Sequence, residues 1–269
     1  MLHEKIYIDP SDERVFLETY ALADPNVAAR DAILILPGGA YRGISERERM
    51  YTPLAFLGKG INTFVLTYSI GEDAVYPRQL LDACRALKYI KENAEKYHIN
   101  PNRIFALGYS AGGHLLGLLT VHHDVGEREL GLPKDYLKVR GSLFCYSAVS
   151  AWGSIKGRSF ENLLKKPFAE MTDEEKEFFS IEKNITSDSP PAFIWHTSED
   201  KSVSISNSLK LCQAYYDAGQ VVELHVFPYG PHAIVLGTEF TSYNGDACIQ
   251  PRAEIWVDEA FKWIKGLDR

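Results

Sequence analysis

The sequence predicts an α/β fold with a mainly parallel central sheet and helices on both of its faces. Short apolar runs, typical of strands, alternate along the chain with segments in which apolar residues recur every three or four positions. A strand, a helix and another strand in succession favour parallel pairing, because the chain must cross over the sheet before it returns. Such sheets bind ligands at the carboxyl ends of their strands, where we expect the functional residues.

The first half of the chain supplies four expected strands and two expected helices. The strands are residues 15–22, 32–36, 61–68 and 104–107. The first alternates between apolar and polar residues, as a half-exposed strand does, whereas the second is a continuous apolar run. A helix over 50–56 ends at Gly58, and an amphipathic helix over 77–97 begins at a proline, which suits the first turn of a helix.

The second half continues the alternation after a long interruption. We expect a loop over 124–138, a strand over 139–146, a polar helical insertion at about 150–189, strands over 192–197 and 221–227, and helices over 204–218 and 253–264. With 269 residues, of which 45% are hydrophobic, the chain is long enough for one well-buried core and too short for two such domains. We therefore predict one domain over residues 1–269 that carries the insertion.

The segment Gly108-Tyr109-Ser110-Ala111-Gly112 is the strongest chemical signal. It follows an apolar run and precedes a second apolar run at helical spacing, the context of a nucleophile elbow. Glycine on both sides is expected because side chains there would collide where the helix doubles back past the strand. Ser110 is therefore the candidate nucleophile.

A serine hydroxyl needs a general base to act as a nucleophile, and that base needs a carboxylate to orient it. On this kind of sheet the expected chain order is serine, acid, histidine. Asp200 follows the strand that ends at Thr197, and His232 follows the strand that ends at Phe227. Glu199 remains an alternative to Asp200, because only the direction of the two side chains decides between them.

At these motifs the sequence resembles the α/β-hydrolase esterases. The similarity is greatest to small acetyl esterases and acetyl-xylan-type carbohydrate esterases related to hormone-sensitive-lipase-like enzymes. The residues that carry it are Pro37-Gly38-Gly39-Ala40-Tyr41, Asn100-Pro101-Asn102-Arg103-Ile104, Gly108 to His114, Pro190 to Thr197 before Asp200, and Glu223 to Phe227 before Gly230-Pro231-His232.

The resemblance implies an α/β-hydrolase fold and assigns roles to several residues. Ser110, Asp200 and His232 would form the catalytic triad, and the amides of Gly39, Ala40 and Ala111 would form the oxyanion hole. Ala40 stands where the family usually has a third glycine, which is tolerable if the φ of Ala40 is negative, and Ser202 to Ile205 replace a more typical Val-Pro pattern. The resemblance also suggests a homo-oligomer.

Composition excludes several other classes of function. A net charge of −7 argues against a nucleic-acid surface, which needs clustered lysine and arginine. The four cysteines are widely separated and contain no C-x-x-C pair, so no zinc site is indicated, and we expect no other metal or cofactor. We find no membrane-length apolar run and no basic leader at the start of the sequence, so we expect a cytoplasmic protein with no membrane partner.

We expect the substrate to be a small-molecule ester with a short acyl group, such as an acetylated xylo-oligosaccharide. The predicted insertion is rich in lysine and glutamate, unlike the broad apolar lid of an interfacial lipase. Tyr41, Trp152 and Tyr229, with Tyr243, lie in or near predicted loops and are candidates to stack on a sugar. Two alternatives remain, a serine peptidase of the same fold and a non-catalytic binding protein that retains it.

Overall fold

A computed structural model of the protein describes residues 1–72, 74–152, 157–243 and 245–267. Within these residues, eight strands form one sheet in the order β1-β2-β4-β3-β5-β6-β7-β8. Their bounds are β1 (Lys5–Tyr7), β2 (Phe16–Tyr20), β3 (Arg30–Leu36), β4 (Asn62–Thr67), β5 (Ile99–Tyr109), β6 (Ser142–Cys145), β7 (Ala192–Thr197) and β8 (Val222–Phe227). Strands β3 to β8 are parallel to one another, and β1 and β2 pair antiparallel at one edge. The mainly parallel α/β sheet is confirmed.

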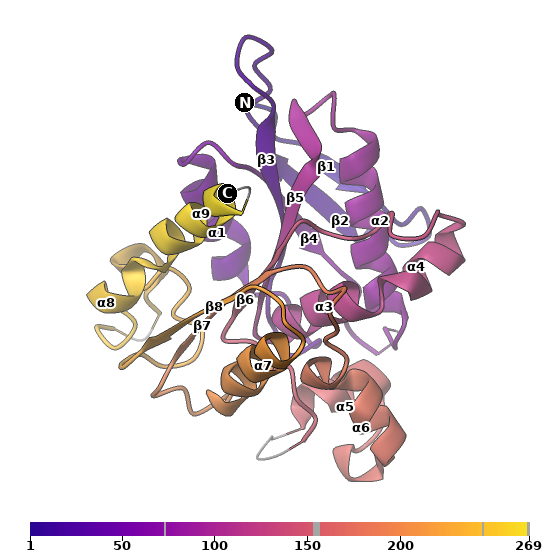
Figure 1. Ribbon diagram of the computed structural model, residues 1–269, viewed down its shortest axis with the longest axis vertical. Coiled ribbons are helices and arrows are strands. Elements are labelled where there is room, and N and C mark those ends of the chain that lie inside the picture. Colours follow the sequence, from indigo (N-terminus) through magenta and orange to yellow (C-terminus); the bar gives the residue numbers. More distant parts are fainter. Residues whose placement is uncertain (73, 153–156, 244, 268–269) are drawn as a thin grey trace.

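Helices cover both faces of this sheet (Figure 1). The helices between and after the strands are α1 (Glu46–Leu57), α2 (Arg78–Glu92), α3 (Ser110–Val121), α4 (His123–Leu130), α7 (Ser206–Asp217), α8 (Pro251–Glu254) and α9 (Trp256–Gly266). Helices α1 and α9 pack on one face, and α2, α3, α4 and α7 pack on the other. Among the described residues, no helix has both the length and the apolar character needed to cross a bilayer.

The core consists of two layers of buried side chains, one on each face of the sheet. Successive residues of β3 show the division, since Leu34 and Leu36 enter one layer and Ile33 and Ile35 enter the other. This follows from the two-residue period of a strand, which points neighbouring side chains to opposite faces. It explains why the sequence of β3 is continuously apolar.

Three elements differ from the sequence-based expectation. Strand β1 has only three residues and is held by antiparallel pairing with β2, so its sequence shows little periodicity. Residues 124–130, expected in a loop, belong to α4, which packs on α2 with Gly126 against Cys84. The last helix is divided into α8 and α9.

The insertion after β6 forms two short helices and two 3-10 turns. These are α5 (Arg158–Leu164), η1 (Phe168–Glu170), α6 (Asp173–Phe179) and η2 (Ile181–Lys183), whereas residues 153–156 lie outside the described part. A capping box between Thr172 and Glu175 starts α6. Asn162 of α5 donates a hydrogen bond of 2.7 Å to the carbonyl oxygen of Ala40. The insertion therefore reaches the loop that follows β3.

Candidate active site

Ser110 lies in the tight turn between β5 and α3. Its φ of +51° is a left-handed value that residues with a side chain rarely adopt. A β-carbon on Gly108 would lie 2.4 Å from the carbonyl oxygen of Gly112, and one on Gly112 would lie 2.1 Å from that of Leu36. The expected need for glycine on both sides of Ser110 is therefore confirmed.

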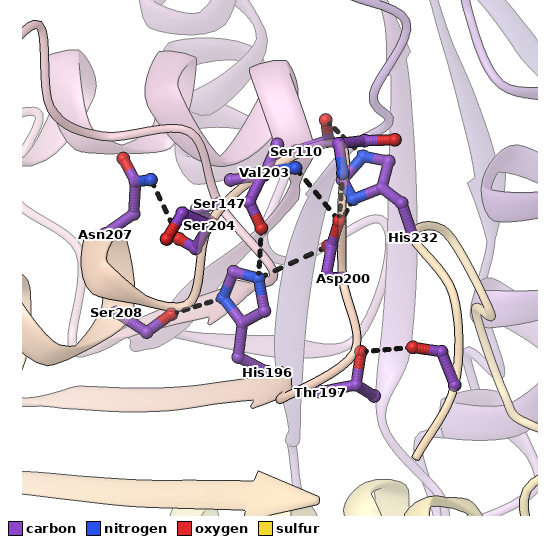
Figure 2. Close-up of polar contacts among 12 residues, drawn as sticks. Ser110, Ser147, His196, Thr197, Asp200, Val203, Ser204, Asn207, Ser208 and His232 are labelled. Atoms are coloured by element: carbon purple, nitrogen blue, oxygen red, sulfur yellow. Dashed lines mark hydrogen bonds and ion pairs between the residues drawn. The ribbon is translucent and has the colours of Figure 1, made fainter. Parts of the chain in front are cut away.

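Ser110, His232 and Asp200 form a continuous hydrogen-bonded line (Figure 2). His232 Nε2 lies 2.9 Å from Ser110 Oγ, and His232 Nδ1 lies 2.6 Å from Asp200 Oδ2. The three side chains follow β5, β8 and β7, whose carboxyl ends meet at the same edge of the sheet. This arrangement can transfer a proton from the serine hydroxyl to the imidazole while the carboxylate holds the ring.

Both oxygens of the Asp200 carboxylate have hydrogen-bond donors. Oδ1 accepts from the backbone N–H groups of Ser202 and Val203, at 2.8 and 2.9 Å, and Oδ2 faces His232 and His196. Burial alone would raise the pKa of Asp200, but the hydrogen bonds from His196 and His232 outweigh burial and hold that pKa well below its usual range. Asp200 is therefore ionised at neutral pH.

The alternative acid, Glu199, points elsewhere. Its carboxylate accepts a hydrogen bond of 3.2 Å from the backbone N–H of Gly230, at the start of the loop that carries His232. Of these two neighbouring carboxylates, the one within hydrogen-bond distance of the His232 ring is that of Asp200. Glu199 instead contacts the backbone of the loop.

His196 is a residue of the site that sequence analysis treated only as part of a strand. Its buried ring lies with Nε2 at 3.2 Å from Asp200 Oδ2 and 3.0 Å from the carbonyl oxygen of Val203 (Figure 2). Because both partners are acceptors, we assign the ring proton to Nε2, and Nδ1 then accepts from Ser208 Oγ at 2.8 Å. The signal in the sequence was the position of His196 at the end of β7, just before the acid.

The loop after β3 contains two of the predicted oxyanion residues, Gly39 and Ala40, which line the same cavity as Ser110. Gly39 has a φ of +140° and Ala40 has a φ of +54°, so the condition of a negative φ at Ala40 is not met. An alanine in this region costs about 1–2 kcal/mol, and surrounding contacts compensate: Asn162 holds the Ala40 carbonyl, and the Arg42 and Gly43 amides both donate to the Gly39 carbonyl at 3.0 Å. Ala111 lies in the first turn of α3, where N–H groups have no acceptor within the helix.

A cavity of ≈ 350 Å³ opens over Ser110. Its lining includes the small residues Gly39, Ala40 and Ala148, and the insertion contributes Gly157 to Phe160. The other lining residues besides Ser110 are Ser45, Glu48, Ser202, Val203, His232 and Ala233. Several of the lining side chains are polar, including that of the exposed Arg158.

Comparison with known proteins identifies the family. The model of the BD-FAE family matches residues 20–215, which is most of the chain. The chain belongs to the BD-FAE family. The matched BD-FAE region includes Ser110 and Asp200, and His232 lies beyond its end.

Relatives of this BD-FAE protein include hydrolases and esterases. An acetylxylan esterase of Xylanibacter ruminicola is 27% identical over 79% of this chain and 43% of its own length. The chain spans about a third to a half of the length of the curated relatives first matched.

Two solved structures match nearly all of the chain. An acetyl ester-xyloside bifunctional hydrolase from Caldicellulosiruptor lactoaceticus is 28% identical, with a TM-score of 0.85 over 98% of this chain and 96% of its own. An α/β hydrolase from a Medee basin deep-sea metagenome library is 32% identical, with a TM-score of 0.80 over 100% and 99% of the two chains. The α/β-hydrolase fold and the resemblance to esterases of that fold are confirmed.

The structure does not place Tyr41 where a substrate could reach its side chain. The ring is fully buried, and its hydroxyl lies 2.8 Å from His114 Nδ1. His114 Nε2 donates to the carbonyl oxygen of Phe179, and burial lowers the pKa of His114 to about 4, although the hydrogen bond to Phe179 acts in the opposite direction. Both residues of this BD-FAE protein therefore have packing roles, and the expectation for Tyr41 is corrected.

Trp152 and Tyr229 also lie outside the cavity over Ser110. Trp152 lines a separate groove of ≈ 890 Å³ beside α7, together with Glu182, Lys210 and Gln213. Tyr229 is 57% exposed, and it is not among the residues that line the cavity over Ser110. The predicted contacts of these two aromatic residues with substrate are not supported by their positions.

Tyr243 and Arg47 hold the loop that carries His232. The Tyr243 hydroxyl donates to the His232 carbonyl oxygen at 3.1 Å, and the Arg47 guanidinium lies 3.9 Å from the centre of the Tyr243 ring. Arg47 also donates to the carbonyl oxygens of Ala233 and Thr241, at 3.0 and 2.8 Å. Tyr243, expected as part of a stacking surface, thus contacts the backbone of the histidine itself.

Proposed function

We propose that this protein is a serine carboxylesterase that hydrolyses short-chain acetyl esters, including those of small acetylated carbohydrates such as xylo-oligosaccharides. The observation that carries the proposal is the line of Ser110, His232 and Asp200 beside a small cavity. Two relatives are named as an acetylxylan esterase and an acetyl ester-xyloside bifunctional hydrolase, and these names support an acetylated carbohydrate as the substrate.

The proposed reaction is acyl transfer in two stages. His232 takes the proton of Ser110 as the hydroxyl oxygen attacks the ester carbonyl, and Asp200 stabilises the imidazolium. The proton then passes to the leaving alcohol as the carbon–oxygen bond breaks, which leaves an acyl-enzyme on Ser110. Water repeats the sequence, with the proton again passing through His232, and releases the acid. The amides of Gly39, Ala40 and Ala111 are the proposed donors to the oxyanion, each worth about 3 kcal/mol.

We expect p-nitrophenyl acetate to be hydrolysed with a higher kcat/KM than p-nitrophenyl octanoate. An octanoyl group has six additional methylenes, each worth about 0.8 kcal/mol against apolar surface, but the residues that line the cavity include the polar Arg158, Ser159 and Ser202. Initial rates with both esters, with Ser110→Ala as the background, measure this preference. A preference for the octanoate would contradict the short-chain proposal.

The carbohydrate part is tested separately, by acetate release from acetylated xylo-oligosaccharides. We expect release that depends on Ser110, because an acetyl ester of a sugar presents the same carbonyl group to Ser110 as p-nitrophenyl acetate does. An enzyme that cleaves p-nitrophenyl acetate but releases no acetate from these oligosaccharides would retain the esterase proposal and exclude this substrate class.

Hydrolysis should slow as the pH is lowered, because a general base must be unprotonated to act. A protonated His232 has no lone pair to accept the Ser110 proton. Because the pKa of Asp200 is held below its usual range, this carboxylate stays ionised throughout and adds no second decline. The measurement is kcat/KM for p-nitrophenyl acetate from pH 5 to 8, and a flat profile would contradict the role of His232.

A further inference from the structure

Glu48 is a buried carboxyl group at the site that the proposed reaction does not use. It lies in the first turn of α1, where only 1% of the residue is exposed, and it lines the cavity over Ser110. Glutamate is rarely buried this deeply unless its oxygens have partners. Its two oxygens contact two different parts of the site.

The first contact is with the loop that carries the proposed oxyanion donors. Glu48 Oε2 accepts a hydrogen bond of 2.6 Å from the backbone N–H of Gly38, the residue before Gly39 and Ala40. A β-carbon on Gly38 would lie 3.1 Å from Glu48 Oε2 and 3.0 Å from Ser110 Cβ. Gly38 is thus enclosed between Glu48 and the nucleophile, so movement of Glu48 would displace the loop relative to Ser110.

The second contact is with the aromatic wall behind the histidine. Glu48 Oε1 accepts a hydrogen bond of 3.0 Å from the hydroxyl of Tyr146, which follows β6. The Tyr146 ring packs edge-on against the His232 ring, with centres 5.1 Å apart and planes at 71°, and it also contacts Tyr109 and Trp195. Tyr146 has a φ of +38°, a strained value that its contacts must maintain.

Both hydrogen bonds of Glu48 can form whether its carboxyl group is charged or neutral. Burial raises the pKa of Glu48 above its ordinary value, although hydrogen bonds from Gly38 and Tyr146 and the charges of His232 and Arg47 act in the opposite direction. In either protonation state the carboxyl group can accept from the Gly38 N–H and form a hydrogen bond with the Tyr146 hydroxyl.

We propose that Glu48 is a positioning residue. Its buried side chain holds both the loop of Gly38 to Ala40 and the Tyr146 ring that packs against His232. The inference rests on the proposed esterase function. Displacing the loop by a fraction of an ångström changes how its N–H groups meet the oxyanion, which forms only in the transition state. Loss of Glu48 should therefore lower kcat and leave KM nearly unchanged.

The experiment compares Glu48→Ala, Glu48→Gln and Tyr146→Phe with the wild type in kcat and KM for p-nitrophenyl acetate. We expect kcat to fall by about 10- to 100-fold in Glu48→Ala, the loss associated with small misalignments at a reacting centre. Glu48→Gln should stay within about fivefold of wild type, because its amide accepts from Gly38 and donates to the Tyr146 oxygen. Tyr146→Phe, which keeps the ring and loses the hydroxyl, should fall between the two.

Glu46→Gln is the matched control. Glu46 lies on the same turn of α1, pairs with Arg49 at the surface and should leave both kinetic constants unchanged. Melting temperatures for all variants separate misfolding from misalignment. If Glu48→Ala does not fold, a reduced kcat in folded Tyr146→Phe supports the proposal, and a wild-type kcat in Tyr146→Phe overturns it.

Two results with folded proteins would overturn the proposal directly. A wild-type kcat in Glu48→Ala would show that the contacts are dispensable, and a loss in Glu48→Gln as large as in Glu48→Ala would show that charge, not position, is required. An inactive wild type would instead contradict the proposed esterase function, so the failures of the two proposals are distinguishable.

Discussion

Ser110→Ala should abolish ester hydrolysis, with kcat reduced by about 10⁶-fold, the size of loss found when the nucleophile is removed from a serine protease. Alanine keeps the elbow backbone and the cavity but removes the oxygen that attacks the carbonyl. His232 Nδ1 would keep its hydrogen bond to Asp200, but no hydroxyl group would lie beside His232 Nε2 to give up a proton. Steady-state hydrolysis of p-nitrophenyl acetate gives the size of the loss.

Covalent labelling provides a second measurement of the same prediction. A fluorophosphonate should label the wild type on Ser110 and should not label Ser110→Ala. Ser147→Ala is a suitable control, because Ser147 is a buried serine beside the elbow whose Oγ contacts the carbonyl oxygens of Cys145 and Gly108. If Ser110→Ala were still labelled, or still hydrolysed the ester, another residue would be the nucleophile and the proposed mechanism would be contradicted.

Asp200→Asn should lower kcat by about 10⁴-fold, the loss seen when the same change is made in a serine protease triad. The asparagine amide retains nearly the same shape, so Oδ1 can still accept from Ser202 and Val203. An NH₂ group toward His232 Nδ1, however, favours the tautomer with the proton on Nε2, and that nitrogen can then no longer accept from Ser110. The loss should appear in kcat, and because the buried His196 N–H would also lose its acceptor on Oδ2, the melting temperature should fall as well.

Glu199→Gln is the matched control for Asp200→Asn, because it changes the adjacent carboxylate in the same way. We expect it to retain nearly full activity, since Glu199 contacts the backbone N–H of Gly230 and a glutamine oxygen can accept the same hydrogen bond. If Glu199→Gln lost activity and Asp200→Asn retained it, the roles of the two acids would be reversed.

Much of this fold could be predicted because its signals are local. The strand over 192–197 was expected with the bounds that the structure shows, since a short apolar run between turn residues has few other conformations available. Helix α4 was missed because its few apolar residues acquire a partner only when α2 lies beside it. Strand β1 was missed for the same reason, since β2 supplies its hydrogen bonds.

The candidate site shows the same division. Ser110, Asp200 and His232 could be selected from chain order, because a parallel sheet brings the ends of its strands to one edge. The φ of Ala40 could not be predicted, because it is imposed by contacts such as the hydrogen bond from Asn162 in the insertion. Tyr41 was misplaced because an aromatic residue in a loop can face either solvent or the core.

The amino-acid sequence alone therefore established the alternation of strands and helices, the glycines around Ser110 and the order of the three polar residues. These depend on steric and periodic relations between residues close in the chain. The tertiary structure alone decided that His196 supports Asp200 and that Glu48 contacts both Gly38 and Tyr146. Such contacts join segments far apart in the sequence, and their distances exist only after the sheet has brought those segments together.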